Sequence, residues 1–445
     1  MLLPVGFISL TENMLTQEVS TFVKIFPFSR GGRILYSTLT GATALIQEDF
    51  PERLRNEKLT IEEKQNLIEM GILINNIDNE KQDILNLFDQ WNQKKKTLNV
   101  IAVMNLTCNL KCIYCYEGDR KNTDTHMSKE TVDNLITFLS KRLDGNEKLY
   151  IDFYGGEPLL SLPLIRGISE RMLKIAERKG IQYQFSLVTN GTLLSPAVVD
   201  SLIPLGLKSL KVTIDGPCEI HDLQRPRISG AGSFHTIVEN LMDAYRKIQV
   251  QIGGNFFWDN YRRFPELLDY LLEYGLDPKE LLAVKFDPIA ETEGKNVISD
   301  FGKGCRSINE PWLSEASVFL REEILKRGFS TPQVKLSPCM ILFEKEYVVN
   351  YDGVIYKCPG FICHKDYIIG NVKEEDPVVP HIYKPNLWKN TKCMDCGYLP
   401  LCFGGCRYME FVRTGRIDNV DCRYDYFEAT LGAFIDQEVR YDSGQ

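Results

Sequence analysis

The middle of the chain alternates short apolar runs with longer segments in which apolar residues recur every three or four positions. The short runs predict strands and the longer segments predict amphipathic helices, and their alternation is typical of a parallel α/β sheet or barrel. Six such β/α units form an incomplete TIM-type barrel, with catalytic groups expected at the carboxyl ends of its strands. The predicted strands are 99–104, 150–154, 183–189, 210–214, 250–257 and 282–287, and the predicted helices are 128–143, 164–178, a helix from Ser195, 233–246 and 264–274.

The amino-terminal part, residues 1–97, has a different periodicity and no cysteine, which predicts a separate domain. Apolar runs on both sides of the turn 29–32 predict a β-hairpin, and Pro27 favours an edge strand because proline cannot donate to a ladder. The sequence Thr60-Ile61-Glu62-Glu63 is a capping box that predicts the start of a helix. The domain is therefore expected to be winged-helix-like, with further elements at a helix from Gly41, a helix ending at Met70, a strand over 71–74 and a linking helix over 78–96.

Composition and charge restrict the class of protein. A chain of 445 residues with 44% hydrophobic residues predicts two or three domains with substantial cores. A net charge of -8 argues against a nucleic-acid partner. No apolar run reaches the roughly 18 residues of a membrane span, and the first residues lack the cationic start of a signal peptide, so a cytoplasmic enzyme without a membrane partner is expected. In such a protein, 13 cysteines indicate metal ligands rather than disulfides.

Three of these cysteines form the spacing Cys108-x3-Cys112-x2-Cys115, directly after the first predicted strand of the barrel. Thiolates are the usual ligands of iron-sulfur clusters, and short spacers let neighbouring sulfurs reach different irons of one cubane. Three thiolates leave the fourth iron open. Structural zinc sites normally have four protein ligands, and no fourth Cys or His follows closely. The polar residues between the cysteines also argue against three buried thiols without a role.

This segment resembles the cluster loop of radical S-adenosylmethionine (SAM) enzymes, including the aromatic residue, Tyr114, before the last cysteine. The resemblance implies a [4Fe-4S] cluster on Cys108, Cys112 and Cys115 whose open iron binds the amino and carboxylate groups of SAM. It also implies cleavage of SAM to a 5'-deoxyadenosyl radical that abstracts hydrogen. Tyr114 would then lie near the adenine, and ordinary packing is the alternative interpretation of this residue.

Two further motifs are expected at the same edge of the barrel. Gly155-Gly156-Glu157-Pro158 follows the second strand, where glycines allow close backbone approach and a carboxylate or carbonyl can accept from an ammonium. The motif alone is also typical of a strand-to-helix turn, but its place after the cysteine loop resembles the GGEP motif that binds the SAM amino group. By the same resemblance, Thr213 contacts the ribose and Arg225 contacts the SAM carboxylate. A surface salt bridge is the alternative for Arg225.

The carboxyl-terminal third contains the spacing Cys393-x2-Cys396-x5-Cys402-x3-Cys406, with further cysteines before and after it. Together with Cys339, Cys358 and Cys422, this set resembles the SPASM domain, the auxiliary-cluster extension of peptide and protein maturases. A zinc ribbon suits the four spaced cysteines equally well. It leaves the other three cysteines without a role.

The resemblance implies two auxiliary [4Fe-4S] clusters. Cys393, Cys396, Cys402 and Cys422 hold one of them. Cys339, Cys358 and Cys406 hold the other, for which Cys305 and Cys363 are the candidate fourth ligands. Three alternatives stay open for each of these two cysteines: it closes the cluster, it binds nothing, or the cluster keeps an iron free for a substrate thiolate.

The chain is thus expected to have three domains: a winged-helix-like domain over 1–97, a radical SAM barrel over 98–300, and a bridging region with a SPASM domain over 301–445. The acidic residues Glu62 and Glu63 give the predicted helix of the first domain the wrong charge for DNA. The layout instead resembles the module that binds the leader of a precursor peptide by adding it to a sheet edge. A structural cap on the barrel is the alternative.

The resemblance implies an enzyme that modifies a ribosomally made peptide by hydrogen abstraction and a thioether or carbon-carbon crosslink, supplied with electrons by a donor such as ferredoxin or flavodoxin. An anaerobic sulfatase maturase, which forms formylglycine, is the second hypothesis. Those relatives carry an aspartate directly after the cysteine that matches Cys358, whereas this chain has Pro359. A noncatalytic iron-sulfur or zinc scaffold is the third. No catalytic acid or base is identified.

Overall fold

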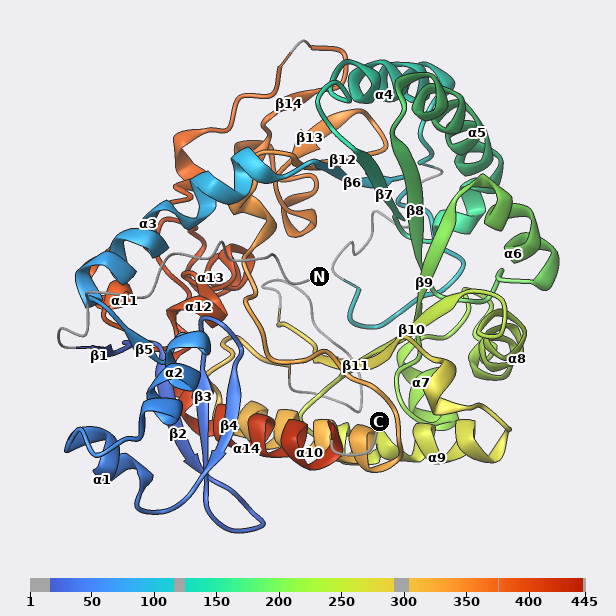
Figure 1. Cartoon of the computed structure of the whole chain (residues 1–445). Helices are drawn as coiled ribbons and strands as arrows, with labels where there is room; N and C mark the ends of the chain where they lie inside the picture. Colours follow the sequence, from blue (N-terminus) through green and yellow to red (C-terminus); the bar gives the residue numbers. More distant parts are fainter. Residues whose placement is uncertain (1–16, 116–124, 292–303, 375, 443–445) are drawn as a thin grey trace.

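The computed structural model describes residues 17–115, 125–291, 304–374 and 376–442. Its centre is a curved sheet in which six parallel strands follow one another in chain order, with helices on the outer side (Figure 1). The strands are β6 (Thr97–Val103), β7 (Lys148–Tyr154), β8 (Gln182–Thr189), β9 (Leu207–Thr213), β10 (Gln249–Phe256) and β11 (Ala283–Pro288). The prediction of a partial barrel of six β/α units is confirmed.

Five of the six outer helices follow the strands at the predicted places, and the helix over 218–224 was not predicted. Ser128 caps the first of them by accepting a hydrogen bond from the backbone N–H of Thr131 at 3.0 Å. Gly180, in the left-handed conformation with φ 65°, ends the second. The helices are α4 (Lys129–Lys141), α5 (Leu162–Lys179), α6 (Pro196–Leu202), α7 (Cys218–Gln224), α8 (Phe234–Ala244) and α9 (Pro265–Glu273).

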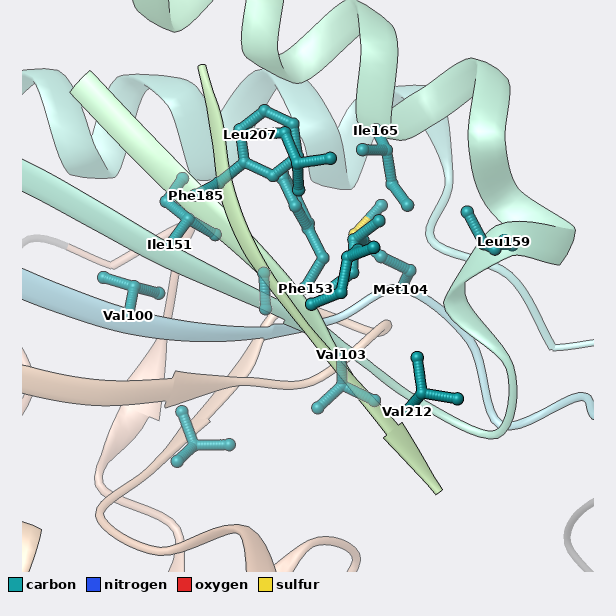
Figure 2. Close-up of a cluster of buried hydrophobic side chains, with 14 of the residues drawn as sticks. Val100, Val103, Met104, Ile151, Phe153, Leu159, Ile165, Phe185, Leu207 and Val212 are labelled. Carbon is teal, nitrogen blue, oxygen red and sulfur yellow. The ribbon is translucent and has the colours of Figure 1, made fainter. Parts of the chain in front are cut away.

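The main hydrophobic core lies between the sheet and these helices. Ile151 and Phe153 of β7, Phe185 of β8 and Ile165 of α5 are fully buried there (Figure 2). The residues of β7 alternate strictly between buried and partly exposed. Because successive side chains of a strand point to opposite faces, the other face of β7 lines the inside of the barrel.

The parallel sheet continues beyond the barrel. β12 (Glu346–Val349) pairs in parallel with β6, and β13 (Val354–Tyr356) and β14 (Gly370–Asn371) follow in antiparallel pairing. Strands on both sides of the boundary predicted at residue 300 therefore belong to one sheet. The domain boundaries themselves stay a prediction.

The carboxyl-terminal helices surround the remaining cysteines. α10 (Pro311–Lys326) packs along α14 (Tyr424–Asp442), as Figure 1 shows at its lower edge. Three shorter helices lie between them in the chain: α11 (Thr391–Met394), α12 (Leu399–Cys402) and α13 (Arg407–Thr414). Single 3-10 turns occur at Pro158–Ser161, Ile203–Leu205, Tyr261–Arg263, Pro278–Glu280, Met340–Leu342, Pro359–Phe361, Lys365–Tyr367 and His381–Tyr383. No helix in the described ranges is long and apolar enough to cross a bilayer.

The amino-terminal region contains a three-stranded antiparallel sheet in the order β2-β3-β4 and a two-stranded sheet of β1 and β5. The predicted hairpin is confirmed as β2 and β3, and Pro27 lies on an edge strand as expected. The capping box is confirmed, since Thr60 and Glu63 bond to each other's backbone N–H. The elements are β1 (Glu18–Val19), β2 (Val23–Pro27), β3 (Arg33–Ser37), β4 (Thr43–Ile46), α1 (Phe50–Arg55), α2 (Ile61–Glu69), β5 (Leu73–Ile74) and the linking helix α3 (Ile77–Lys94).

The helix predicted from Gly41 is wrong, because residues 43–46 form strand β4. Gly41 has a φ of +75° and its N–H bonds to the carbonyl of Ser37, which makes it part of a tight turn. The backbone N–H of Ser37 in turn bonds to the carbonyl of Ala42 at 2.9 Å. The turn returns the chain antiparallel to β3, so that β4 pairs with it, and the helix begins only at α1.

Candidate functional site

The cysteine loop after β6 lies at the carboxyl ends of the barrel strands. Cys108, Cys112 and Cys115 line a cavity of about 330 Å³. The same cavity is lined by five of the six predicted SAM contacts, which come from distant parts of the chain: Tyr114, Gly155, Gly156, Thr213 and Arg225. The structure therefore brings together three thiols and these side chains where the barrel architecture predicts chemistry.

The two glycines of the second motif allow the chain to pack directly on the cysteine loop. A Cβ atom at Gly155 would lie 2.4 Å from the carbonyl oxygen of Asn105, and one at Gly156 would lie 2.4 Å from that of Thr107. The backbone N–H groups of Gly156 and Glu157 donate to these same two carbonyls at 3.0 and 2.9 Å. Any larger side chain would push the loop away, so the glycines position the three cysteines relative to β7.

Glu157 lies in this motif, but its carboxylate is turned towards the end of β8. It is fully buried and accepts hydrogen bonds from the N–H of Leu159, the hydroxyl of Thr189 and the N–H of Asn190, at 3.0, 2.8 and 2.8 Å. Burial raises the pKa of this carboxyl. These hydrogen bonds connect the end of β7 with the end of β8. The role of Glu157 towards the SAM amino group stays a prediction.

A buried polar network connects the cysteine loop with the ends of β9 and β10. The Tyr114 hydroxyl donates to Asp215 and accepts from Arg225 Nη1 at 2.6 Å and from Asn255 Nδ2 at 3.0 Å. Asp215 is fully buried and lies 3.8 Å from the Arg225 guanidinium. Arg225 is 8% exposed, so its contact with Asp215 is internal and the alternative of a surface salt bridge is wrong.

No local sequence pattern singles out Asp215 and Asn255, whose importance depends on contacts between strand ends. The only available signal was the position of Asp215 directly after a predicted strand. Arg225 Nε is buried and has no hydrogen-bond partner among the described residues, although Arg225 lines the cavity. A guanidinium that lines the cavity can donate to the carboxylate of a ligand. Its role towards SAM stays a prediction.

A second cavity, of about 450 Å³, occupies the interior of the barrel. Its floor and walls include polar residues from the inner faces of three strands, among them Asp152, Ser186 and Lys211. Burial raises the pKa of Asp152, which accepts a hydrogen bond from Ser186. Tyr154, Val188, Lys211 and Tyr408 line both cavities, so the two adjoin each other. This polar interior was not predicted, although the polar residues at alternate positions of 150–154 are a signal for it.

The structure also gathers the first carboxyl-terminal cysteine set. Cys393, Cys396, Cys402 and Cys422 all line one cavity of about 210 Å³, together with apolar residues. These four cysteines are free thiols. Four thiols around one enclosed space fit the ligand set of an iron-sulfur cluster, and the cluster assignment stays a prediction.

The second set lies against the barrel core. The pKa of the Cys358 thiol is raised by burial and by the neighbouring sulfurs of Cys339 and Cys406, so the three thiols lie close together. Cys305 is instead packed with Phe256 and Leu313, and its burial raises the thiol pKa to about 12.

Cys363 has a φ of +66°, and its backbone N–H donates to the Tyr356 hydroxyl at 3.1 Å. These contacts do not select either Cys305 or Cys363 as the fourth ligand, which stays a prediction. Within the described residues, no three His, Cys, Asp or Glu side chains converge on a single metal ion. Thiolates that bind separate irons of one cubane are not expected to converge on a single metal ion.

Comparison with known proteins agrees with this geometry. Residues 103–271 match the model of the Radical SAM superfamily. These residues form a radical SAM domain. A [4Fe-4S] cluster and SAM follow from this family, and the cavity is lined by thiols and a guanidinium that would hold them, those of Cys108, Cys112, Cys115 and Arg225.

The radical SAM enzyme is similar to a cysteine-type anaerobic sulfatase-maturating enzyme from Clostridium perfringens (strain 13 / Type A), with 26% identity over 67% of this chain and 86% of the relative. A solved structure of native anSMEcpe with bound AdoMet and Cp18Cys peptide has a TM-score of 0.54 and 18% identity, and covers 78% of this chain and 98% of that chain. Streptococcus suis SuiB bound to precursor peptide SuiA has a TM-score of 0.51 and 14% identity, over 92% and 99%. These two likenesses show the shared fold.

Proposed function

We propose that this radical SAM enzyme modifies a ribosomally synthesised precursor peptide by hydrogen abstraction, followed by formation of a thioether or carbon-carbon crosslink. The observation that carries this proposal is a groove of about 830 Å³ in the amino-terminal region, between strand β4 and helix α2. It lies outside the barrel, where a leader peptide could be held while the modified segment reaches the cavity at the cysteine loop.

The groove has the features of a site that adds a peptide to a sheet. Within the described residues, β4 is an edge strand, so its outer backbone groups are available to a further strand. Leu45 of β4 lines the groove and is 58% exposed. On the opposite wall, the ion pair of Arg53 and Glu63, at 2.8 Å, connects α1 with α2 and keeps the groove in shape. An exposed apolar side chain beside a free strand edge is typical of β-strand addition.

The comparisons favour the same proposal. The likeness to SuiB extends over 92% of this chain, whereas the likeness to anSMEcpe extends over 78%. SuiB is described with a precursor peptide, and its longer coverage supports a leader-binding role for the amino-terminal region.

The residues that line the interior cavity support the proposal that a peptide substrate lies between two cysteine sets. Pro359, which follows Cys358, and Tyr408, two residues after Cys406, line the interior cavity. A substrate in the barrel would therefore lie between the cysteine loop on one side and the set of Cys339, Cys358 and Cys406 on the other. This arrangement suits a reaction that gives up a second electron after hydrogen abstraction.

When bound, the reduced cluster and SAM supply a 5'-deoxyadenosyl radical that removes one hydrogen atom from the peptide. Closing the crosslink releases the second hydrogen as a proton and an electron. Cys339, Cys358 and Cys406 would hold an auxiliary [4Fe-4S] cluster that would accept this electron, and the proton would pass to solvent. A donor such as ferredoxin or flavodoxin supplies the electron that cleaves SAM. The chain's own contribution is to hold the cysteine loop, through Gly155 and Gly156, and to exclude water from the polar network of Tyr114, Asp215 and Arg225.

Sulfatase maturation is the second candidate, favoured by the sulfatase-maturating relative that matches 67% of the chain. Pro359 stands where, by resemblance, those enzymes carry an aspartate base, and a prolyl side chain cannot move a proton. This difference places the candidate behind peptide crosslinking.

The two functions are separated by coexpression with peptides. A short reading frame beside the gene supplies the test substrate, and mass spectrometry should show a loss of two hydrogens per crosslink. The matched sample contains a sulfatase peptide with its active-site cysteine. An unmodified precursor together with formylglycine in the sulfatase peptide would overturn the proposal.

A further inference from the structure

A lysine inside the barrel carries a charge that the described chain does not balance. Lys211 lies on β9, two residues before Thr213, and lines both the cavity at the cysteine loop and the interior cavity. The residue is half-buried. Its side-chain ammonium makes no hydrogen bond or ion pair with any residue that the structure describes.

The other charged residues that line these cavities all have partners. Asp152 accepts a hydrogen bond from the hydroxyl of Ser186. Asp287 lies 2.7 Å from the ammonium of Lys285. Arg225 belongs to the polar network of the cysteine loop. The ammonium of Lys211 lines both cavities and has no partner among the described residues, so it is available to a ligand of opposite charge.

The neighbouring strand keeps the lysine side chain in place. Lys211 is aligned with Gln251 of β10, but its Cε lies against Gly253, two residues further towards the carboxyl end of that strand. A Cβ at Gly253 would come within 2.8 Å of the Lys211 Cε. The side chain therefore leans towards the carboxyl ends of the strands, over a glycine that leaves room for it.

We propose that Lys211 is a specificity residue that binds a carboxylate of the peptide substrate where the two cavities meet. This inference rests on the peptide substrate of the proposed function. The carboxylate belongs either to an acidic side chain or to the carboxyl terminus of the peptide. A hydrogen bond between an ammonium and a carboxylate is about twice as strong as one between neutral groups, so Lys211 selects against neutral peptides at this position.

The test measures binding of small probes to the cluster-reconstituted enzyme saturated with SAM, so that the SAM carboxylate already occupies its own site. N-acetyl-glutamate amide represents the acidic side chain, N-acetyl-alanine represents the carboxyl terminus, and N-acetyl-glutamine amide is the neutral control. Calorimetry should show at least one carboxylate probe binding about tenfold more tightly than the neutral probe. The probe that binds more tightly identifies the source of the carboxylate.

Lys211→Met should abolish this preference, whereas Lys208→Met should retain it, because Lys208 is exposed on the same strand. Equal binding of all three probes by the unaltered enzyme would overturn the proposal without any variant. An undiminished preference in Lys211→Met would overturn it as well. A fall in SAM affinity in Lys211→Met with probe binding unchanged would assign the lysine to the SAM site instead. If Lys211→Met does not fold, Lys211→Gln serves in its place.

Probe binding does not require the crosslinking reaction. If the enzyme prefers carboxylate probes through Lys211 but leaves every precursor peptide unmodified, the proposed crosslinking is wrong and the carboxylate site stands. If the enzyme crosslinks the precursor peptide but shows no preference for carboxylate probes, the carboxylate site is wrong and the proposed function stands.

Discussion

The contact between Gly156 and the cysteine loop makes a sharp prediction for Gly156→Ala. The added Cβ would lie 2.4 Å from the carbonyl oxygen of Thr107 and 2.6 Å from that of Leu106. The closer contact is 1.0 Å shorter than the 3.4 Å at which ordinary contacts begin. Both atoms are backbone, so the loop itself has to move. Overpacking of this kind costs about 1–3 kcal/mol of stability.

The effect on activity should exceed the effect on stability. A displacement of about 1 Å in a group that positions reactants can reduce a rate about 100-fold. We expect Gly156→Ala to form 5'-deoxyadenosine from SAM about 100-fold more slowly under reduction with dithionite, as measured by chromatography. The iron content of the carboxyl-terminal cysteine sets should be unchanged, because the loop movement is local.

The matched control is Gly167→Ala, in the middle of helix α5. A Cβ there meets nothing within 4 Å. Replacing a helical glycine by alanine should stabilise the protein by about 0.5–1 kcal/mol and leave the rate of SAM cleavage unaltered. If Gly156→Ala cleaves SAM as fast as Gly167→Ala, the close packing of this motif on the cysteine loop does not position the site.

Three further predictions follow from other parts of the molecule. Replacing the thiols of 108–115 by alanine should abolish formation of 5'-deoxyadenosine while iron bound by the carboxyl-terminal cysteines remains; continued cleavage in that variant would refute the cluster assignment. Leu45→Glu should weaken binding of the precursor peptide about tenfold in fluorescence anisotropy, since an apolar contact in the groove is lost, and Val378→Glu, at an equally solvent-facing residue that is 75% exposed, should not. Burial lowers the pKa of Lys357 from 10.5 to about 8, so the unfolded chain binds more protons between these values and stability should rise with pH across that window. Thermal unfolding should show this rise in the unaltered enzyme and a smaller one in Lys357→Met.

The barrel was predictable because its signal is local. Each strand of the sheet is a short apolar run and each outer helix repeats its apolar residues with helical spacing, so 183–189 and 164–178 were placed within two residues of β8 and α5. The helix expected from Gly41 failed because a tight turn and pairing with β3 outweigh the local preference of four residues.

The chemical site was predictable only in part. Cysteine spacing identified the thiols, since their ligand geometry is encoded in neighbouring positions. Asp215, Asn255 and Lys211 gain their importance from side chains on other strands, and no local pattern indicates such contacts. The orientation of Glu157 was likewise beyond the sequence, because it depends on donors at the end of β8.

The pairing of β12 with β6 has a consequence for electron transfer. β6 leads directly into the cysteine loop, and β13, which pairs with β12, leads to Cys358. The two groups of thiols thus follow strands of one hydrogen-bonded sheet, with only β12 between those strands. The sheet restricts the separation of these strands, so in the proposed reaction an electron would pass between the two cysteine sets without a domain movement during turnover.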